Sequence, residues 1–153
     1  MTVEEPPNTE INYVSPQEAI EEGAEPQHRF DLTIEGEKIG SAEFEYLSKP
    51  LPHYLLSDLY VEFEHKGKGY ASKILEKMEE FLKERKKPGI LVDAIMVGDP
   101  ASDMYARRGW KEVPDSGGLH VFNWPDDVSL DVLKGYSFRY TDPMIREERK
   151  DQE

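Results

Sequence analysis

Cysteine is absent from all 153 residues of the chain. Its absence excludes disulfide bonds, thiolate metal ligands and a cysteine nucleophile together, and it is consistent with a reducing compartment. No apolar run reaches the roughly 18 residues that a membrane-spanning helix needs. The first residues, MTVEEPPNTE, are acidic and unlike a secretory signal. We therefore expect a cytoplasmic protein without a membrane segment.

Positive charge is also scarce. The chain has 19 Lys and Arg residues against 32 Asp and Glu residues, which gives a net charge of −13. Such a surface repels phosphate backbones and argues against nucleic-acid binding. It would attract a cationic partner such as an amine, or it serves solubility alone.

The motifs of several enzyme classes are missing as well. The sequence has no G-x-x-x-x-G-K-[ST] loop and no G-x-S-x-G nucleophile elbow. His28, His65 and His120 do not have the spacing of metal ligands, so we expect no metal centre. We expect these three histidines on the surface or in loops.

The length suits one domain. We expect a flexible N-terminal arm over residues 1–9, a single domain over residues 10–140 and a charged tail over residues 141–153.

Period-2 and period-3.6 patterns predict the regular elements of the N-terminal third. Ser15 and Pro16 are suited to the cap and first position of a short helix. Gly36 predicts a hairpin turn and Gly40 a bulge. The expected elements are a strand over Ile11–Val14, a helix over Pro16–Glu22, and hairpin strands over Arg29–Glu35 and Lys38–Tyr46.

The middle of the chain predicts a strand, a glycine loop, an amphipathic helix and a second buried strand. The strands are Tyr54–Glu62 and Ile90–Val97, and the helix runs from about Gly69 to Lys86, stopped by Pro88-Gly89. This order makes a βαβ unit, whose strands are parallel with a right-handed crossover.

The C-terminal third predicts a short helix and a hairpin. Asp99 is suited to the N-cap of that helix, Pro100 to its first turn and Gly109 to its stop. The hairpin pairs Trp110–Val113 with Leu119–Trp124. A further strand is expected around Tyr136–Tyr140.

The loop Lys66–Ala71 has the features of a phosphate cradle. Helix N-termini carry partial positive charge and unpaired N–H groups, and glycines allow a ligand close to the backbone. Lys66 and Lys68 add full positive charge. A plain turn before a surface helix is the other interpretation.

This loop resembles the pyrophosphate loop of the GNAT superfamily of acyl-CoA N-acyltransferases, whose pattern is Gln/Arg-x-x-Gly-x-Gly/Ala. The chain has KGKGYA there, with Lys66 in place of the usual Gln or Arg. The lysine keeps the positive charge but not the planar fork of Arg.

A second motif of that superfamily follows one strand later. The family pattern is Asn-x-x-Ala-x-x-x-Tyr-x-x-x-Gly-Phe. Ala101, Tyr105 and Gly109 are in register with it, Trp110 replaces the Phe, and Gly98 stands at the Asn position. The two motifs in this order are far more specific than either alone.

The resemblance covers about residues 29–124 and implies a fold of the α/β (α+β) class. The implied sheet is mixed and mostly antiparallel, with a parallel splayed pair in the middle and helices on both faces. The implied function is transfer of an acetyl group from acetyl-CoA to a primary amine, with no metal. The acceptor would be a small molecule or a peptide, cationic acceptors included, and the protein a monomer or homodimer.

The resemblance also implies binding residues. Backbone groups near Tyr60, Val61 and Phe63 would hold the pantetheine arm as an added strand would. The pyrophosphate would lie on the loop amides, with Lys73 as a further cation. The implied loop residues are Lys66, Gly67, Lys68, Gly69, Tyr70 and Ala71.

Tyr105 lies where the family has the tyrosine that protonates the leaving thiolate; by itself it could equally be a packed aromatic. The general base is open among Asp58, Glu62 and His53, or a water relay, and each side chain could equally be a solvated charge at a strand end. Asp93 could be an interior hydrogen-bond anchor or a pocket residue.

Two other functions stay open. One is a non-catalytic module that binds CoA, which the missing Asn and the undetermined base allow. The other is a nucleotide-phosphate-binding domain that uses the same glycine loop without a thioester.

Overall fold

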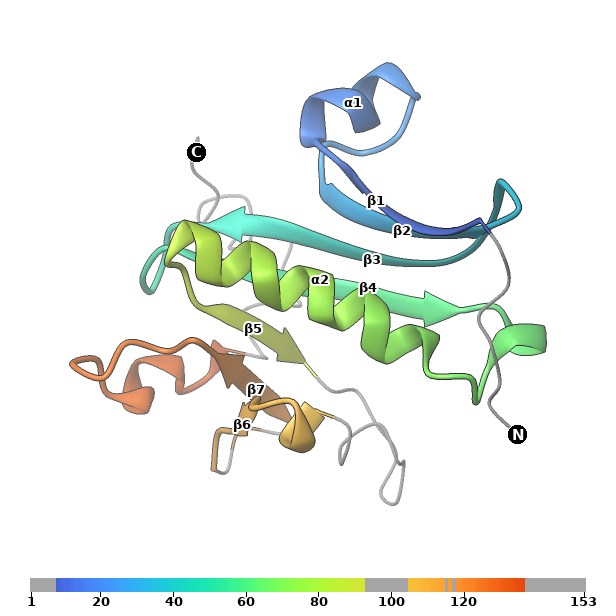
Figure 1. Cartoon of the computed structure of the whole chain (residues 1–153). Coiled ribbons are helices and arrows are strands. Elements are labelled where there is room, and N and C mark those ends of the chain that lie inside the picture. The colour runs from blue at the N-terminus through green and yellow to red at the C-terminus, as the bar shows by residue number, and fades with distance from the viewer. Residues whose placement is uncertain (1–7, 93–104, 115, 117, 137–153) are drawn as a thin grey trace. The chain divides into compact units, whose positions relative to one another are not determined.

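The computed structural model describes residues 8–92, 105–114, 116 and 118–136. Its described strands form one mixed sheet in the order β1-β2-β3-β4-β5-β7-β6 (Figure 1). The strands are Thr9–Val14 (β1), His28–Ile34 (β2), Glu37–Leu47 (β3), His53–Val61 (β4), Gly89–Val92 (β5), Lys111–Glu112 (β6) and Leu119–Phe122 (β7). The helices are Pro16–Glu21 (α1) and Tyr70–Arg85 (α2), with 3₁₀ turns at Phe63–His65 (η1) and Leu130–Leu133 (η2).

The expected mixed, mostly antiparallel sheet with one parallel pair is confirmed. β1–β2, β2–β3, β5–β7 and β6–β7 are antiparallel, whereas β4 and β5 are parallel. The helix α2 connects the parallel pair, as the βαβ pattern predicts. Within the described residues no helix is long and apolar enough to cross a bilayer.

The chain divides into two compact units. Unit 1 consists of residues 1–45 and 57–80, and unit 2 of residues 46–56 and 81–153.

The start of unit 1 follows the predicted signals closely. Ser15 caps α1: its Oγ accepts from the Glu18 N–H at 3.2 Å, and the Glu18 carboxylate accepts from the Ser15 N–H. This is a capping box, with Pro16 at the start of the helix. The β2–β3 turn has both central residues at positive φ, Glu35 at 53° and Gly36 at 80°, as a type I′ hairpin turn requires.

Gly40 marks the bulge that its place in the sequence predicts. The register between β2 and β3 shifts beside it, between Leu32 and Thr33. A Cβ on Gly40 would lie 2.9 Å from the Tyr60 carbonyl oxygen, so the glycine also lets β4 approach closely.

The two faces of the β1–β3 region differ sharply. One face carries an aromatic cluster, in which His28 stacks on Phe44 at 5.1 Å and Tyr13 Oη lies 2.6 Å from His28 Nδ1. The other face carries charge: Arg29 bonds Asp31 at 2.7 Å and Glu22 at 2.8 Å. Strand alternation separates the two sets, because neighbouring residues point to opposite faces.

The helix α2 ends at Arg85, one residue before the predicted end at Lys86 and three before Pro88. Lys86 takes a left-handed φ of 56°, and its N–H donates to Lys83 O at 3.2 Å. The N–H of Lys87 donates to Leu82 O at 3.1 Å. This is a Schellman end built on lysine instead of glycine.

The core of unit 2 lies on one face of β5 and β7. The buried cluster comprises Leu47, Leu55, Ile90, Val113, Leu119, Val121, Leu133 and Tyr136. On the opposite face Tyr54 packs edge-on against Phe81 of α2, at 5.1 Å between ring centroids. The predicted hairpin is confirmed as β6 and β7.

One expectation is largely outside the described residues and a second is wrong. Tyr136, where a strand is expected to begin, is helical and packs in the buried cluster of unit 2, and residues 137–140 lie outside the described residues. His28 and His120 are buried, not on the surface, because each lies in a strand among aromatic rings. Only His65 of the three expected surface histidines is partly exposed.

Candidate functional site

The loop between β4 and α2 is exposed, and its backbone conformation favours glycine at two positions. Gly67 and Gly69 both have φ of +81°, and a Cβ at either position would meet no atom within 4 Å. Glycine is therefore favoured at both positions by the positive φ angle and not by a lack of space for a side chain. Residues 66–69 are all exposed, so a ligand can reach their backbone.

The head of α2 follows this loop directly. The Lys73 N–H donates to the Gly69 carbonyl at 3.2 Å, which makes Gly69 the cap residue. The N–H groups of residues 70–72 precede that bond and have no partner inside the helix. N–H groups in this position, together with the helix dipole, are suited to binding an anion.

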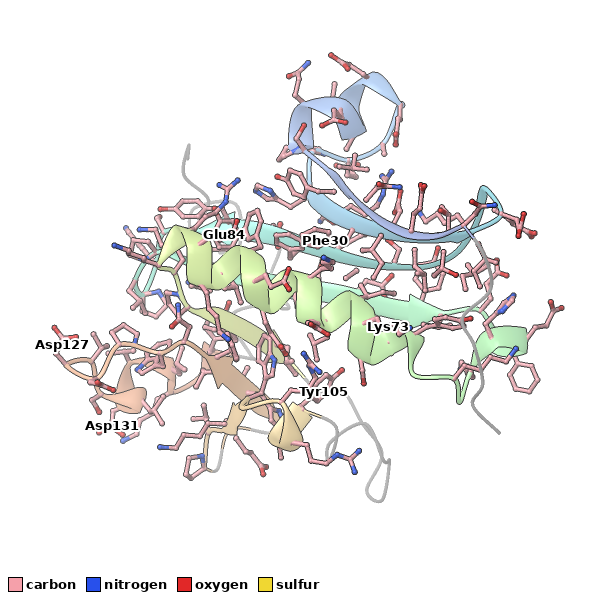
Figure 2. All side chains as sticks on the ribbon, in the orientation of Figure 1. Phe30, Lys73, Glu84, Tyr105, Asp127 and Asp131 are labelled. Atoms are coloured by element: carbon pink, nitrogen blue, oxygen red, sulfur yellow. The ribbon has the colours of Figure 1, made fainter. Side chains whose placement is uncertain are left out.

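Lysine side chains surround this loop. Lys66 Nζ lies 6.0 Å from the ring centroid of Phe63, and Lys73 Nζ lies 5.9 Å from that of Tyr70. Figure 2 labels Lys73 on the first turns of α2. Lys68 is exposed within the loop. Three lysines therefore lie in the loop or in the first turn of α2, although the whole chain is acidic.

His65 is a feature of this region that the sequence reasoning missed. Its Nδ1 is buried and has no hydrogen-bond partner among the described residues, and its ring lies 6.2 Å from that of Tyr70. A buried nitrogen without a partner is uncommon and is usually satisfied by a ligand or water. The open glycines and this nitrogen both fit a phosphate-bearing ligand at the loop. No sequence pattern distinguishes His65 from an ordinary loop histidine.

The second half of β4 presents two of the three candidate bases. Asp58, Tyr60 and Glu62 are exposed, whereas Val61 is buried. The alternation puts Asp58 and Tyr60 on one face of the strand. The Glu62 N–H donates to Ile39 O at 2.7 Å, so that amide is already used.

His53, the third candidate base, is excluded. It is fully buried, and both ring nitrogens make hydrogen bonds, Nδ1 to Leu51 O at 2.7 Å and Nε2 to Tyr136 Oη at 2.8 Å. A carbonyl oxygen only accepts, so Nδ1 is the protonated nitrogen and Nε2 accepts from the phenol. Its lone pair is therefore occupied, and the residue is structural.

Tyr105 lies in unit 2 at the end of a short helical segment. The N–H of Trp110 donates to Tyr105 O at 3.0 Å, and the N–H of Gly109 to Ala106 O at 3.2 Å. Gly109 has φ of +92°, so the predicted glycine stop is confirmed as a Schellman motif.

The Tyr105 side chain is buried between two aromatic rings. Its ring centroid lies 6.5 Å from that of Trp110 and 5.7 Å from that of His120. Figure 2 labels Tyr105 on this segment. Packing in this cluster does not conflict with a role of Tyr105 in proton transfer. A general acid must be held in a fixed orientation, and burial among other rings provides that.

The candidate cofactor-binding residues of the loop and the candidate bases on or next to β4 belong to unit 1, whereas Tyr105 belongs to unit 2. Asp93, Gly98, Asp99, Pro100 and Ala101 lie outside the described residues. Among the described residues no group of three or more His, Asp or Glu side chains could hold a metal ion.

The family comparison defines the class of the protein, which is that of the acyltransferases. The chain belongs to the GNAT acetyltransferase family, whose family model matches residues 2–110. A search of curated proteins finds no match.

Solved structures with the same fold include several N-acetyltransferases. A GNAT family N-acetyltransferase (YhbS) from Escherichia coli, in complex with CoA, is 16% identical with a TM-score of 0.57, over 88% of this chain and 89% of that one. The ribosomal-protein-S18-alanine N-acetyltransferase from Escherichia coli is 13% identical with a TM-score of 0.58, over 80% and 99%. Identities this low show the fold alone.

Proposed function

We propose that this protein transfers an acetyl group from acetyl-CoA to the primary amine of a small molecule or peptide. The observation that carries the proposal is the loop at the head of α2. Its two glycines at φ of +81° leave open space over the first amides of a sixteen-residue helix. Family membership supplies the reaction class.

The cosubstrate would lie along β4 and end on the loop. The amides of residues 67–71 bind the pyrophosphate, since the Lys66 N–H already donates to Phe63 O at 3.2 Å, and the lysines in and beside the loop neutralise its charge. Backbone groups of Tyr60, Val61 and Phe63 bind the pantetheine arm as an added strand would. Acetyl-CoA itself supplies the thioester that is cleaved.

The reaction needs three proton-handling or charge-stabilising groups. The amine must lose a proton, the carbonyl oxygen needs a donor, and the leaving sulfur must gain a proton. Tyr105 gives its phenolic proton to the sulfur. Glu62 or Asp58, both exposed carboxylates on or next to β4, takes the amine proton directly or through a water. A backbone N–H near Val61 is the oxyanion donor.

The acceptor would be cationic before it loses its proton. The net charge of −13 favours an amine over a phosphorylated or carboxylated acceptor. Association of such an acceptor would slow as salt is added, since added ions screen the attraction.

The test is release of free CoA from acetyl-CoA with a panel of amines: a polyamine, an amino acid and a peptide with a free N-terminus. The chain has no cysteine, so a thiol reagent reports CoA alone. Release with one amine class supports the proposal. Stabilisation by CoA without release from any amine would favour a binding module, and stronger stabilisation by ATP or ADP than by acetyl-CoA would favour a nucleotide binder.

A further inference from the structure

Two lysines at the ends of the glycine loop each lie over an aromatic ring. Lys66 Nζ is 6.0 Å from the ring centroid of Phe63, and Lys73 Nζ is 5.9 Å from that of Tyr70, both within the range of a cation–π contact. In each pair the aromatic residue precedes the lysine by three positions. One pair lies at the start of the loop and the other in the first turn of α2. The loop therefore has a lysine–aromatic pair on each side.

Phe63 is the more unusual of the two aromatic residues, because it does not pack in a core. Its side chain is 85% exposed, far more than those of Ile20, Tyr60 and Val132, which are also large, apolar and exposed. The Lys66 N–H donates to the Phe63 carbonyl at 3.2 Å, so a backbone hydrogen bond closes the same turn. In the part of the chain that the structure describes, the one charged group over the Phe63 ring is the Lys66 ammonium.

The charge of Lys66 is not neutralised by a carboxylate. Glu62 and Glu64 flank Phe63 in the sequence, yet among the described residues neither forms an ion pair with Lys66. Lys68 likewise has no carboxylate partner there. In a chain with 32 acidic residues, a lysine that contacts a ring and not a carboxylate keeps its full charge for an anion.

We propose that Phe63 is a positioning residue for Lys66: its ring holds the ammonium beside the loop amides, where the ammonium meets the phosphate charge of the cosubstrate. This role rests on the proposed function, because acetyl-CoA supplies that charge. A long lysine side chain loses conformational entropy when it binds an anion, and a contact that restricts it beforehand lowers this cost. Lys66 lacks the planar fork of Arg, so its direction depends on such a contact.

The first experiment needs no ligand. The face of an aromatic ring shields the nuclei that lie over it, so carbon–proton NMR of the ¹³C-lysine-labelled protein should show the ε-CH₂ of Lys66 shifted upfield. Lys66→Arg assigns the signal by removing it, and Lys68 is the internal reference within the loop. The upfield shift should be lost in Phe63→Leu. A Lys66 signal that is the same in wild type and Phe63→Leu would overturn the proposed role, whether or not any amine is acetylated.

The second experiment is a double-mutant cycle on CoA affinity, measured by calorimetric titration at low salt. We expect the Kd for CoA to rise about threefold in Phe63→Leu and about fivefold in Lys66→Met. Because Phe63 acts through the ammonium, Phe63→Leu should change the Kd by less than about 1.5-fold once Lys66 is Met. Phe63→Tyr keeps the aromatic face and should keep the wild-type Kd.

Ile20→Ala is the matched control, since Ile20 is an exposed apolar residue of the same unit on α1 and should leave the Kd unchanged. Circular dichroism checks that each variant is folded. Losses in Phe63→Leu and Lys66→Met that simply multiply in the double variant would contradict the positioning role while the proposed function stands. A wild type that binds no CoA would contradict the proposed function, and the role of Phe63 with it.

Discussion

The hydroxyl of Tyr136 donates to Nε2 of His53 across 2.8 Å, and both side chains are buried. The two residues are 83 positions apart in the sequence. The bond ties the segment after η2 to the start of β4 within unit 2. Because Nδ1 of His53 donates to Leu51 O, the imidazole is fully satisfied only while Tyr136 is present.

Tyr136→Phe should therefore destabilise the protein by about 1–2 kcal/mol, because it leaves a buried nitrogen without a donor. Urea unfolding followed by circular dichroism measures the change. Tyr46→Phe is the matched control: this half-buried tyrosine packs on Tyr54 in the same unit and should change stability by less than about 0.5 kcal/mol. Equal effects of the two changes would show that the hydrogen bond contributes little.

Gly69→Ala should weaken acetyl-CoA binding by about tenfold or more, since alanine disfavours the positive φ of Gly69 that presents the amides proposed to bind the pyrophosphate. The backbone strain at φ of +81° also costs about 1 kcal/mol of stability. Gly36→Ala separates the two effects, because Gly36 has φ of +80° and equally open surroundings in the β2–β3 turn. Calorimetric titration should show unchanged affinity in Gly36→Ala; a loss there equal to that in Gly69→Ala would refute the loop assignment.

Tyr105→Phe should lower kcat for acetyl transfer by about a hundredfold and leave the Kd for CoA within about twofold. The phenyl ring keeps the contacts with Trp110 and His120, so the fold is preserved. Steady-state kinetics and CoA titration measure the two quantities. Full activity in this variant would leave Tyr105 as a packing residue only.

Asp31 makes the stability of unit 1 sensitive to acid. Burial favours its neutral form, but hydrogen bonds from Arg29 and the charge of Lys38 outweigh burial, so the pKa of Asp31 lies below its ordinary value. A depressed folded-state pKa adds stability that is present above the unfolded pKa of about 3.9 and is lost as pH falls through the lower folded value.

Asp31→Asn should accordingly cost about 2 kcal/mol at pH 7, because Arg29, only 11% exposed, loses its closest carboxylate. The difference from wild type should shrink as pH falls from about 5 toward 2. Unfolding curves at each pH test this. Asp131→Asn is the control, since the Asp131–Lys134 pair spans 4.0 Å on the exposed surface and should contribute little at any pH. A constant difference for Asp31→Asn across this range would contradict the assignment.

Short sequence patterns predicted those features of the fold that depend on neighbouring residues, such as helix caps and turns. The Ser15 cap, the turn at Gly36 and the stop at Gly109 were all predictable, because each depends on a few adjacent residues and on a backbone conformation that particular residues prefer. The two family motifs predicted the superfamily for the same reason: each is a short pattern of fixed spacing.

Contacts distant in the sequence were not predictable in this way. Nothing beside His53 indicates that Tyr136 occupies its lone pair, which removed it from the candidate bases. Likewise, His120 could be placed beside Tyr105 only once β7 had a register and a buried face. The Lys86 cap was missed because lysine has no preference for positive φ.

The sequence by itself determined the order of elements, the glycine loop at the head of a helix and the membership of the GNAT acetyltransferase family. Tertiary structure alone decided which histidines are buried and which nitrogen of His53 and of His120 carries the proton. The physical reason is that a motif specifies backbone conformation through neighbouring residues, whereas protonation and burial depend on groups that only folding brings into contact.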